Sequence, residues 1–345
     1  MSSLQDLSRR SYRNGDQLEL PVAGIKYYPD HPLMKELDEA CTKGGSALGE
    51  VERLVSAWQN MPQPSPPRGP ENYPIGTLEP VLYQAIRMDR ADVTNYLLNQ
   101  GIRTSRLTLY EALSSKSSSE LWQVLLDHGL DINAPLNTAN EPPPLAFVLR
   151  DVGLTQWFLD HGADPNGEAR WGLTPFLKAV SDSSIPLSTV QLLYESGGNP
   201  NNAVPFVCSA ADDLESATAS GNDVGGGELG GRNLAVLRFL LDLGADPEAR
   251  KWAHNSRGYA SDFDWGSGLN ITLANRRGRM AEELLRRGAR TDSKTLNLAS
   301  RGETALALAE KYVPELVPLV EECRKQELGA VPPRVTLAEG HVSEG

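Results

Sequence analysis

The sequence predicts an all-α fold, a solenoid of about six to seven helix–turn–helix units with long finger loops. One short phrase carries this prediction: two apolar residues, two polar residues and a glycine, clearest in FLDHGADPN at 158–166. Its six copies are spaced by 28, 33, 35, 47 and 44 residues, a period near 33 with one deletion and two insertions. Hydrophobic residues make up 40% of the chain but aromatic residues only 6%, which favours stacked helices over one large globular core. The glycines of the six copies are Gly101, Gly129, Gly162, Gly197, Gly244 and Gly288.

Each copy has the residue types of a helix that ends at its glycine. The apolar pair belongs to the buried face, and glycine adopts the left-handed conformation of a helix cap without a clash at Cβ. A pair of such helices has an apolar face too large to bury alone, so neighbouring pairs must stack. We therefore expect stacked helix pairs whose loops face outward.

A second motif completes the repeat. The segment 172–179 reads GLTPFLKA and the segment 302–309 reads GETALALA, each close to G-x-T-P-L-H-x-A. Pro175 suits the first turn of a helix, where its missing N–H is not needed. Together with the A-D-x-N that follows the glycine, both halves occur in register, and the chain resembles the ankyrin-repeat family over about residues 36 to 325.

The resemblance implies a protein that recognises protein partners through finger loops and the concave face of its helices. Both copies of the second motif lack the His of T-P-L-H-x-A. In the family, that position ties neighbouring turns together by hydrogen bonds. The departure therefore bears on local stability and not on the architecture.

The composition narrows the class of protein and its location. The net charge of −12 argues against binding of nucleic acid or of an anionic membrane by the whole chain. Cys41, Cys208 and Cys323 are far apart in the sequence, and each sits where a small apolar residue would pack in a helix. We expect free core thiols and a reducing intracellular compartment, cytoplasmic, nuclear or both. The N-terminus lacks the apolar core of a secretory signal, and no apolar run approaches the ~18 residues of a membrane-spanning helix.

The chain divides into three parts. Residues 1–35 contain the apolar and aromatic stretch LELPVAGIKYYPDHP, which is expected to cap the first repeat. Residues 36–325 form the repeat array, and residues 326–345 are expected to be a disordered tail. Three insertions interrupt the array, at 59–80, 212–232 and 248–268.

The early helix pairs follow from the apolar spacing. The first pair has apolar residues at 37, 40 and 41 and then at 51, 54, 55 and 58. A serine of KSSSE is expected to cap the second helix of the third pair, and Pro186 marks the start of the second helix of the fifth. The second to fifth pairs are expected within 81–101, 107–129, 144–162 and 174–197.

The later helices are more widely spaced. Helices are expected at 204–212 and 234–243, on either side of the second insertion. A short helix at about 271–274 precedes the sixth copy of the phrase. The last pair begins with a helix at 304–311, and Pro314 is expected at the start of its second helix.

The three insertions differ in composition. The first, 59–80, is rich in proline and is expected to be an extended loop. The second, 212–232, is rich in glycine, serine and acidic residues and is expected to be a mobile loop. The third, 248–268, carries four aromatic residues, a load that a purely disordered linker would seldom have.

The third insertion supplies the candidate site. In an ankyrin-like array this connection projects as a finger at the edge of the concave groove, and an earlier finger of the same edge would carry two further candidates. Aromatic and arginine side chains at such positions make good anchors for a partner. The alternative is that the long finger folds back and buries its own aromatic residues. The candidate partner-binding residues are Arg170, Trp171, Trp252, His254, Arg257, Tyr259 and Trp265.

A catalytic interpretation stays open as an alternative. His254 with Asp262 or Asp264 could form an acid/base pair in a pocket walled by Trp252 and Trp265, as in an enzyme or a small-molecule binder. The sequence contains no nucleotide-binding loop, no zinc-protease or serine-hydrolase motif and no paired C-x-x-C. The leading interpretation is therefore a non-catalytic protein with no cofactor and no metal.

Two further features have ordinary structural explanations. His128 and His161 occur in LDHG, one period apart, and roughly 10 Å between adjacent helices is too far for both to bind one zinc ion. They are expected to stabilise helix C-termini. Six arginines in 15 residues form either a solvated face, a contact with an acidic partner segment, or an end-to-end contact between molecules. These are Arg276, Arg277, Arg279, Arg286, Arg287 and Arg290.

Overall fold

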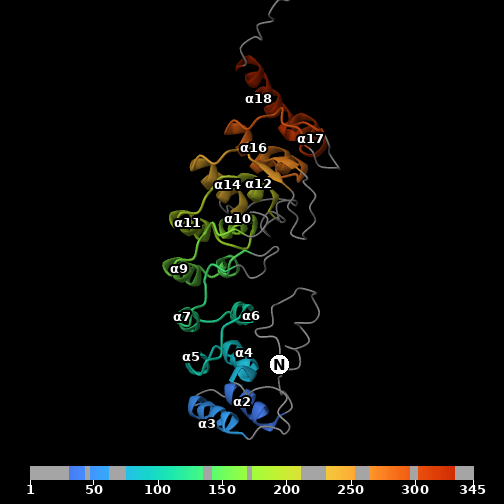
Figure 1. Ribbon diagram of the computed structural model, residues 1–345. Helices are drawn as coiled ribbons and strands as arrows, with labels where there is room; N and C mark the ends of the chain where they lie inside the picture. Colours follow the sequence, from blue (N-terminus) through green and yellow to red (C-terminus); the bar gives the residue numbers. More distant parts are fainter. Residues whose placement is uncertain are drawn as a thin grey trace, which may run out of the picture. The chain divides into compact units, whose positions relative to one another are not determined.

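The computed structural model describes residues 31–42, 47–61, 75–134, 142–168, 173–210, 231–252, 264–295 and 302–330. This part of the chain contains sixteen α-helices, two short 3-10 helices and one two-stranded sheet (Figure 1). The all-α prediction is confirmed, with one short strand pair that it did not include. The chain divides into two compact units, Met1–Pro175 and Phe176–Gly345.

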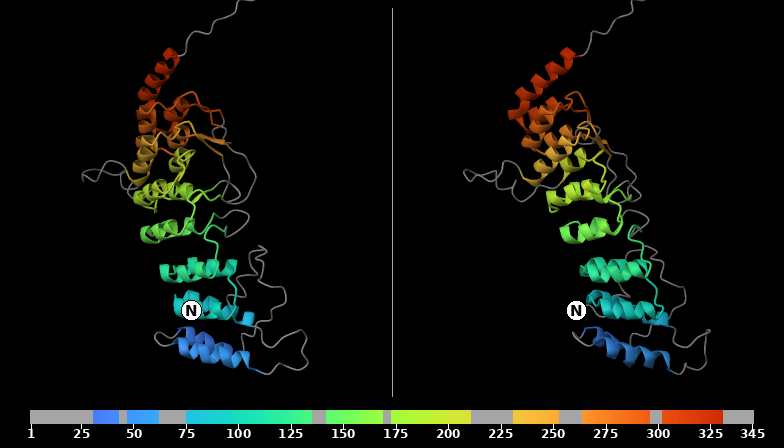
Figure 2. Two further views of the ribbon diagram at one scale, coloured as in Figure 1. Left: turned by 60° about the vertical axis from the view of Figure 1, so that its left-hand side comes forward. Right: turned by 90° about the vertical axis from the view of Figure 1, so that its left-hand side faces the viewer.

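The first unit consists of helix pairs. Its elements are α2 (Pro32–Thr42), α3 (Ala47–Gln59), the 3-10 helix η1 (Ile75–Leu78), α4 (Glu79–Arg87), α5 (Ala91–Asn99), α6 (Arg106–Ser115), α7 (Ser119–Asp127), α8 (Leu145–Val148) and α9 (Val152–Asp160). We call the first helix of each pair the inner helix and the second the outer helix, as in the expected repeat. Inner helix α4 packs against both α2 and α6, and outer helix α5 packs against both α3 and α7 (Figure 2). Trp122 of α7 meets Phe158 of α9 edge-on, with ring centroids 5.0 Å apart.

The second unit repeats this arrangement. Its elements are α10 (Pro175–Ser181), α11 (Leu187–Glu195), α12 (Val204–Ser209), α14 (Arg232–Asp242), β1 (Arg250–Trp252), β2 (Asp264–Ser267), α15 (Gly268–Ala274), α16 (Gly278–Arg286), α17 (Ala305–Tyr312), the 3-10 helix η3 (Pro314–Leu316) and α18 (Val317–Ala330). Inner helix α15 packs against both α12 and α17, and outer helix α14 packs against both α11 and α16. These helices therefore pack against the helix pairs on both sides of them.

The six glycines of the repeated phrase all end a helix in the left-handed conformation. Their φ angles lie between 81° and 97°, a region that glycine adopts without a clash at Cβ. The backbone N–H of Gly101 donates to the carbonyl of Leu98 at 2.9 Å, and that of Gly288 donates to the carbonyl of Leu285 at 3.0 Å. The predicted helix ends are confirmed at every copy.

Most predicted helix starts are also confirmed. The hydroxyl of Ser118 accepts the N–H of Leu121 at 3.3 Å and so caps α7. Pro186 is the residue directly before α11. Pro314 differs from the prediction, because it begins a 3-10 turn and α18 follows only at Val317.

Several predicted boundaries were wrong. Helix α2 begins at Pro32, inside the predicted cap, and the rest of that segment, 1–30, lies outside the described residues. The predicted loop 59–80 ends in η1, where the hydroxyl of Thr77 accepts the indole N–H of Trp58 at 3.0 Å. Helix α18 extends to Ala330, past the predicted start of the tail, and Glu327 within this extension accepts two hydrogen bonds from Thr291.

The first helix pair has a polar exterior. Leu54, Val55 and Trp58 of α3 are fully buried, while the exposed side chains of α2 and α3 are mainly charged, as in Lys35 and Glu52. A polar outer face is what the end of a repeat array needs. Among the described residues, no helix combines the length and the apolar character needed to span a membrane.

Candidate partner-binding site

The structure describes three of the candidate residues, and all three lie in the short sheet. Trp252 ends β1, and Asp264 and Trp265 begin β2. The strands pair antiparallel, with Trp252 opposite Asp264 and Arg250 opposite Ser267, and a bulge lies between these pairs. The two ends of the insertion thus meet in a hairpin stem, which the all-helical prediction missed. The candidates Arg170, Trp171, His254, Arg257, Tyr259 and Asp262 lie outside the described residues.

Side chains just before and within β1 fix the incoming side of the stem. The carboxylate of Asp246 accepts the N–H of Glu248 at 2.8 Å, which forms a tight turn. Glu248 in turn accepts the N–H of Arg290 at 2.7 Å and the hydroxyl of Ser293 at 3.2 Å. Arg250 donates from Nη2 to the carbonyl of Lys294 at 2.6 Å. The stem is therefore held to the segment that follows α16.

The outgoing side of the stem is held by the start of α15. Gly266 has φ +93°, and a Cβ there would lie 2.9 Å from Cβ of Asn270, so a larger residue would be strained. Ser267 and Asn270 form a reciprocal cap at the first turn of α15 and are each 1% exposed. The Asn270 amide also donates to the carbonyl of Ser293 at 3.2 Å. Both strands therefore connect to the same segment, 290–295.

Segment 290–295 is held from its other side as well. The backbone N–H and the hydroxyl of Thr291 donate to the two carboxylate oxygens of Glu327, at 2.8 and 2.9 Å. The backbone N–H of Thr295 donates to the carbonyl of Glu303 at 3.1 Å. The stem thus rests on a segment that is itself fixed by α18 and by the residues before α17.

Two carboxylates near the stem have different environments. Burial raises the pKa of Glu248, although the hydrogen bonds from Arg290 and Ser293 act in the opposite direction. The side-chain hydrogen bond from Arg290 lowers the pKa of Asp292, and these two residues form an ion pair at 2.7 Å. The guanidinium of Arg290 is therefore directed to Asp292, while only its backbone contacts Glu248.

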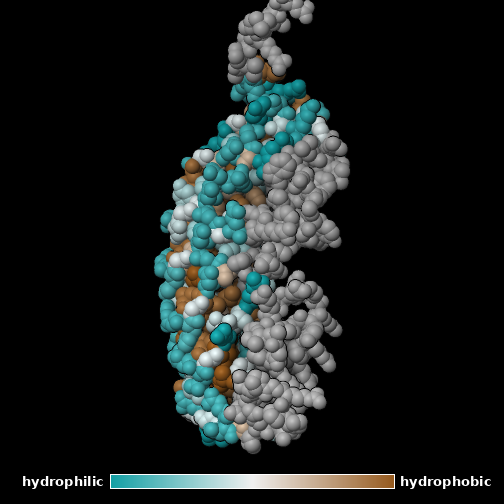
Figure 3. Space-filling view, in the orientation of Figure 1, coloured by the Kyte–Doolittle hydropathy of each residue, from teal (hydrophilic) through white to brown (hydrophobic). Residues whose placement is uncertain are grey.

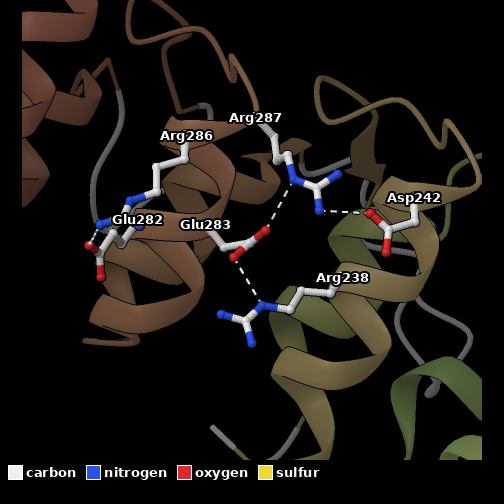
Figure 4. A network of polar contacts seen from close by, with 6 residues as sticks. All are labelled: Arg238, Asp242, Glu282, Glu283, Arg286 and Arg287. Atoms are coloured by element: carbon white, nitrogen blue, oxygen red, sulfur yellow. Dashed lines mark hydrogen bonds and ion pairs between the residues drawn. The ribbon is translucent and has the colours of Figure 1, made fainter. Parts of the chain in front are cut away.

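Three of the clustered arginines form ion pairs within the second unit, and Figure 4 shows two of them, Arg286 and Arg287. Glu283 joins Arg238 of α14 at 3.0 Å to Arg287 at 3.1 Å, and Arg287 continues to Asp242 at 2.7 Å. Arg286 pairs with Glu282 at 2.6 Å, and Arg290 pairs with Asp292 as described above. These arginines lie among carboxylates on an exposed face, as the solvated-face interpretation predicts.

Arg276 and Arg277 lie at the turn between α15 and α16. The guanidinium of Arg277 donates to the carbonyl of Cys208 at 2.6 Å and to that of Ala210, both at the end of α12. The guanidinium of Arg276 lies 5.9 Å from the centre of the Tyr312 ring. Arg277 is thus an internal support for an inner helix, which the prediction of a solvated face did not include.

Arg232 has a matching role that the sequence did not reveal. It is the first residue of α14, and its guanidinium donates to the carbonyls of Ile185 at 2.8 Å, Val180 at 2.9 Å and Ala179. Ala179 and Val180 belong to α10, so the positive charge lies near the C-terminus of an inner helix. Only its place at the end of the predicted second insertion, 212–232, could have drawn attention to it.

The two histidines end helices, as predicted. His128 follows α7, and its Nε2 lies 2.8 Å from Oδ1 of Asn95 on α5. His161 follows α9, with Nδ1 2.7 Å from the carbonyl of Trp157 and its ring stacked on the Trp157 ring at 3.9 Å. Within the described ranges, no group of three or more His, Cys, Asp and Glu residues could hold a metal ion.

The cysteines are free thiols in different surroundings. Cys41 and Cys208 are buried, and burial raises the pKa of Cys41 to about 12. Cys323 is only partly buried, so the prediction of a core thiol was wrong for it. Helix α18 ends the described array, and this leaves part of its surface open to solvent.

The inner helices of the first unit carry a mixed surface. Arg87 of α4 forms two hydrogen bonds with Glu111 of α6, at 3.0 and 3.2 Å. Burial raises the pKa of Asp38 on α2, and nearby Arg87 acts against this shift. Phe147 of α8 is 47% exposed. On the face drawn in Figure 3, hydrophobic residues likewise show between hydrophilic ones.

No protein-family model matches the chain, and no curated protein matches it in sequence. The functional interpretation therefore depends on the residues of this chain.

Proposed function

We propose that this protein is a non-catalytic interaction module of the ankyrin-repeat type, which binds a protein partner through insertion 248–268 and the groove formed by its inner helices. The partner-binding residues in this proposal are those named from the sequence, with Trp252 and Trp265 at the base of the insertion. Arginine and aromatic side chains are the residue types most often found as binding anchors.

A link that recurs between repeats supports the ankyrin-type architecture. Asn133 is the fourth residue after Gly129, and it accepts the N–H of Asp164, the second residue after Gly162, at 2.8 Å. Glu248 is the fourth residue after Gly244, and it accepts the N–H of Arg290, the second residue after Gly288, at 2.7 Å. Repeats of different length thus make the same bond from equivalent positions.

The anchored hairpin stem is the observation that carries the binding proposal. Glu248 and Arg250 hold β1, and Ser267 and Asn270 hold β2, all against the body of the second unit. Binding through residues on a fixed stem costs less conformational entropy than binding through a free loop, because the loop must be ordered when the partner binds. The stem thus gives the aromatic residues of the insertion a defined base.

The register of the stem allows a sharp test. Because Trp252 lies opposite Asp264, residues 253–263 can be replaced by Asn-Gly, a two-residue turn that closes antiparallel strands. Proteins captured from native lysate by the full chain are purified, and their affinities for the full chain and for the shortened chain are compared. We expect the shortened chain to keep its helical circular dichroism and to lose binding. A partner that binds both chains equally contradicts the proposal.

A double variant tests the aromatic residues directly. Trp252→Ala with Trp265→Ala is expected to weaken binding by more than about 2 kcal/mol, roughly 30-fold, while leaving helical circular dichroism unchanged. Leu328→Ala on α18, where the side chain is 67% exposed, is the control for loss of an apolar side chain outside the insertion. Unfolding of the double variant would mean that the two tryptophans belong to the core.

A further inference from the structure

Glu248 occupies the position that Asn133 holds in the first unit, but it can ionise. Both side chains accept the N–H of the second residue after the next glycine, at 2.7 and 2.8 Å. Their second contacts differ. The Asn133 amide donates to the carbonyl of Gly162 at 2.9 Å, whereas the second Glu248 oxygen accepts the hydroxyl of Ser293 at 3.2 Å.

The charge of Arg290 lowers the pKa of Glu248, but burial has the larger effect and raises it. Arg290 pairs through its guanidinium with Asp292. Arg250 donates to a backbone carbonyl, that of Lys294. Asp246, on the same turn, adds a repelling negative charge, and Glu327 holds Thr291 on the far side of the segment. Among the described residues, Glu248 forms no direct ion pair, because the guanidinium of Arg290 contacts Asp292 instead.

We propose that Glu248 is a proton-dependent latch between the hairpin stem and the following repeat, and that uptake of a proton strengthens this latch. In the neutral acid, Oε1 still accepts the N–H of Arg290. The protonated Oε2 donates to the Ser293 hydroxyl, which changes from donor to acceptor. Both hydrogen bonds survive, and the cost of keeping an unpaired charge partly buried is removed.

The direction of the pH dependence follows from burial. Burial raises the folded-state pKa of Glu248 above its ordinary value of 4.5. A group with a raised folded-state pKa contributes stability that is complete below its unfolded-state pKa and is lost as the pH rises through the folded-state pKa. The latch is therefore tighter in acid, whatever partner the insertion binds.

Amide hydrogen exchange of the full chain tests this latch at the bond itself. Glu248→Gln imitates the neutral acid, because its amide keeps one acceptor and one donor. At pH 7 we expect this variant to raise the protection factor of the Arg290 amide about two- to tenfold, because it removes the cost of a partly buried charge while both hydrogen bonds remain. The difference from wild type should shrink as the pH falls toward 4.5, once intrinsic exchange rates are taken into account.

The Asp164 amide serves as the internal reference for the exchange measurement. The Asp164 amide is bonded to Asn133, which does not titrate, so its protection should change less with pH than that of Arg290. In the wild-type chain, the chemical shift of the Arg290 amide should titrate with Glu248, which provides a readout without any variant. The proposal is overturned if Glu248→Gln lowers the protection of Arg290, or if wild-type protection there falls relative to Asp164 in acid.

Discussion

The two units connect their repeats with different side chains. At the helix-pair turns of the first unit, Asp89 accepts the N–H and the hydroxyl of Ser118 at 2.9 and 3.1 Å. At corresponding places in the second unit, Arg232 and Arg277 reach back to the carbonyls at the ends of α10 and α12. At these turns a short side chain makes the link in the first unit, and long cationic side chains make it in the second.

Both arginine links of the second unit lie beside an insertion. Arg277 holds the carbonyl of Ala210, the last described residue before the second insertion, and Arg232 is the last residue of that insertion as predicted, where α14 already begins. Glu248 and Arg250 lie at the base of the third insertion. Because an insertion interrupts the regular packing of a pair, long polar side chains beside it restore the connection to neighbouring repeats. The repeats of the second unit therefore accommodate long insertions where side-chain hydrogen bonds hold the residues at the ends of the insertion.

The largest effect is expected from Arg232. Arg232→Met keeps most of the side-chain volume but removes the donor to three carbonyls, those of Ala179, Val180 and Ile185. Hydrogen bonds to a charged group contribute about 1.5–3 kcal/mol, and a part-buried carbonyl without a donor is costly. We expect urea denaturation to show a loss of about 3 kcal/mol in the free energy of unfolding.

The comparison itself supplies the control for Arg232. Hydrogen exchange should show that Arg232→Met lowers the protection of amides in α10 and α14, and that amides in α4 and α5 keep theirs. Equal losses in both sets would mean that the variant acts on the whole chain. A loss below about 1 kcal/mol would contradict the idea that arginine links support the second unit.

An intermediate effect is expected in the first unit at Asn133. Asn133→Ala removes a bond to Asp164 and a bond to Gly162 and should cost about 1–1.5 kcal/mol in urea denaturation, because the link is exposed. Asn133→Asp keeps the acceptor and loses the donor, so about half of this cost is expected. If neither variant changes the midpoint, this link does not connect the repeats of the first unit.

Local features could be predicted from the sequence, and distant partners could not. The cap of Gly101 and the cap of Ser118 depend on residues within about four positions, so residue type alone identified them. The carbonyl partners of Arg232 lie up to 53 residues away, and no local pattern marks them. For the candidate site, the aromatic content of the insertion marked it in the sequence. The pairing of Trp252 with Asp264 was not predicted, because no alternation of apolar and polar residues indicates strands or their register there.

The smallest effect is expected at the exposed pair between α14 and α16. Arg238 and Glu283 lie 3.0 Å apart, but the arginine side chain is 48% exposed. Exposed ion pairs contribute about 0.2–1 kcal/mol, so Arg238→Met should cost about 0.5 kcal/mol, far less than Arg232→Met. A double-mutant cycle with Glu283→Gln isolates the pair, and its coupling energy should fall in 1 M NaCl, where the Debye length is about 3 Å. A coupling energy that does not depend on salt and is as large as the loss caused by Arg232→Met would contradict this order of effects. Surface charge pairs, and not the guanidinium–carbonyl links, would then distinguish the second unit from the first.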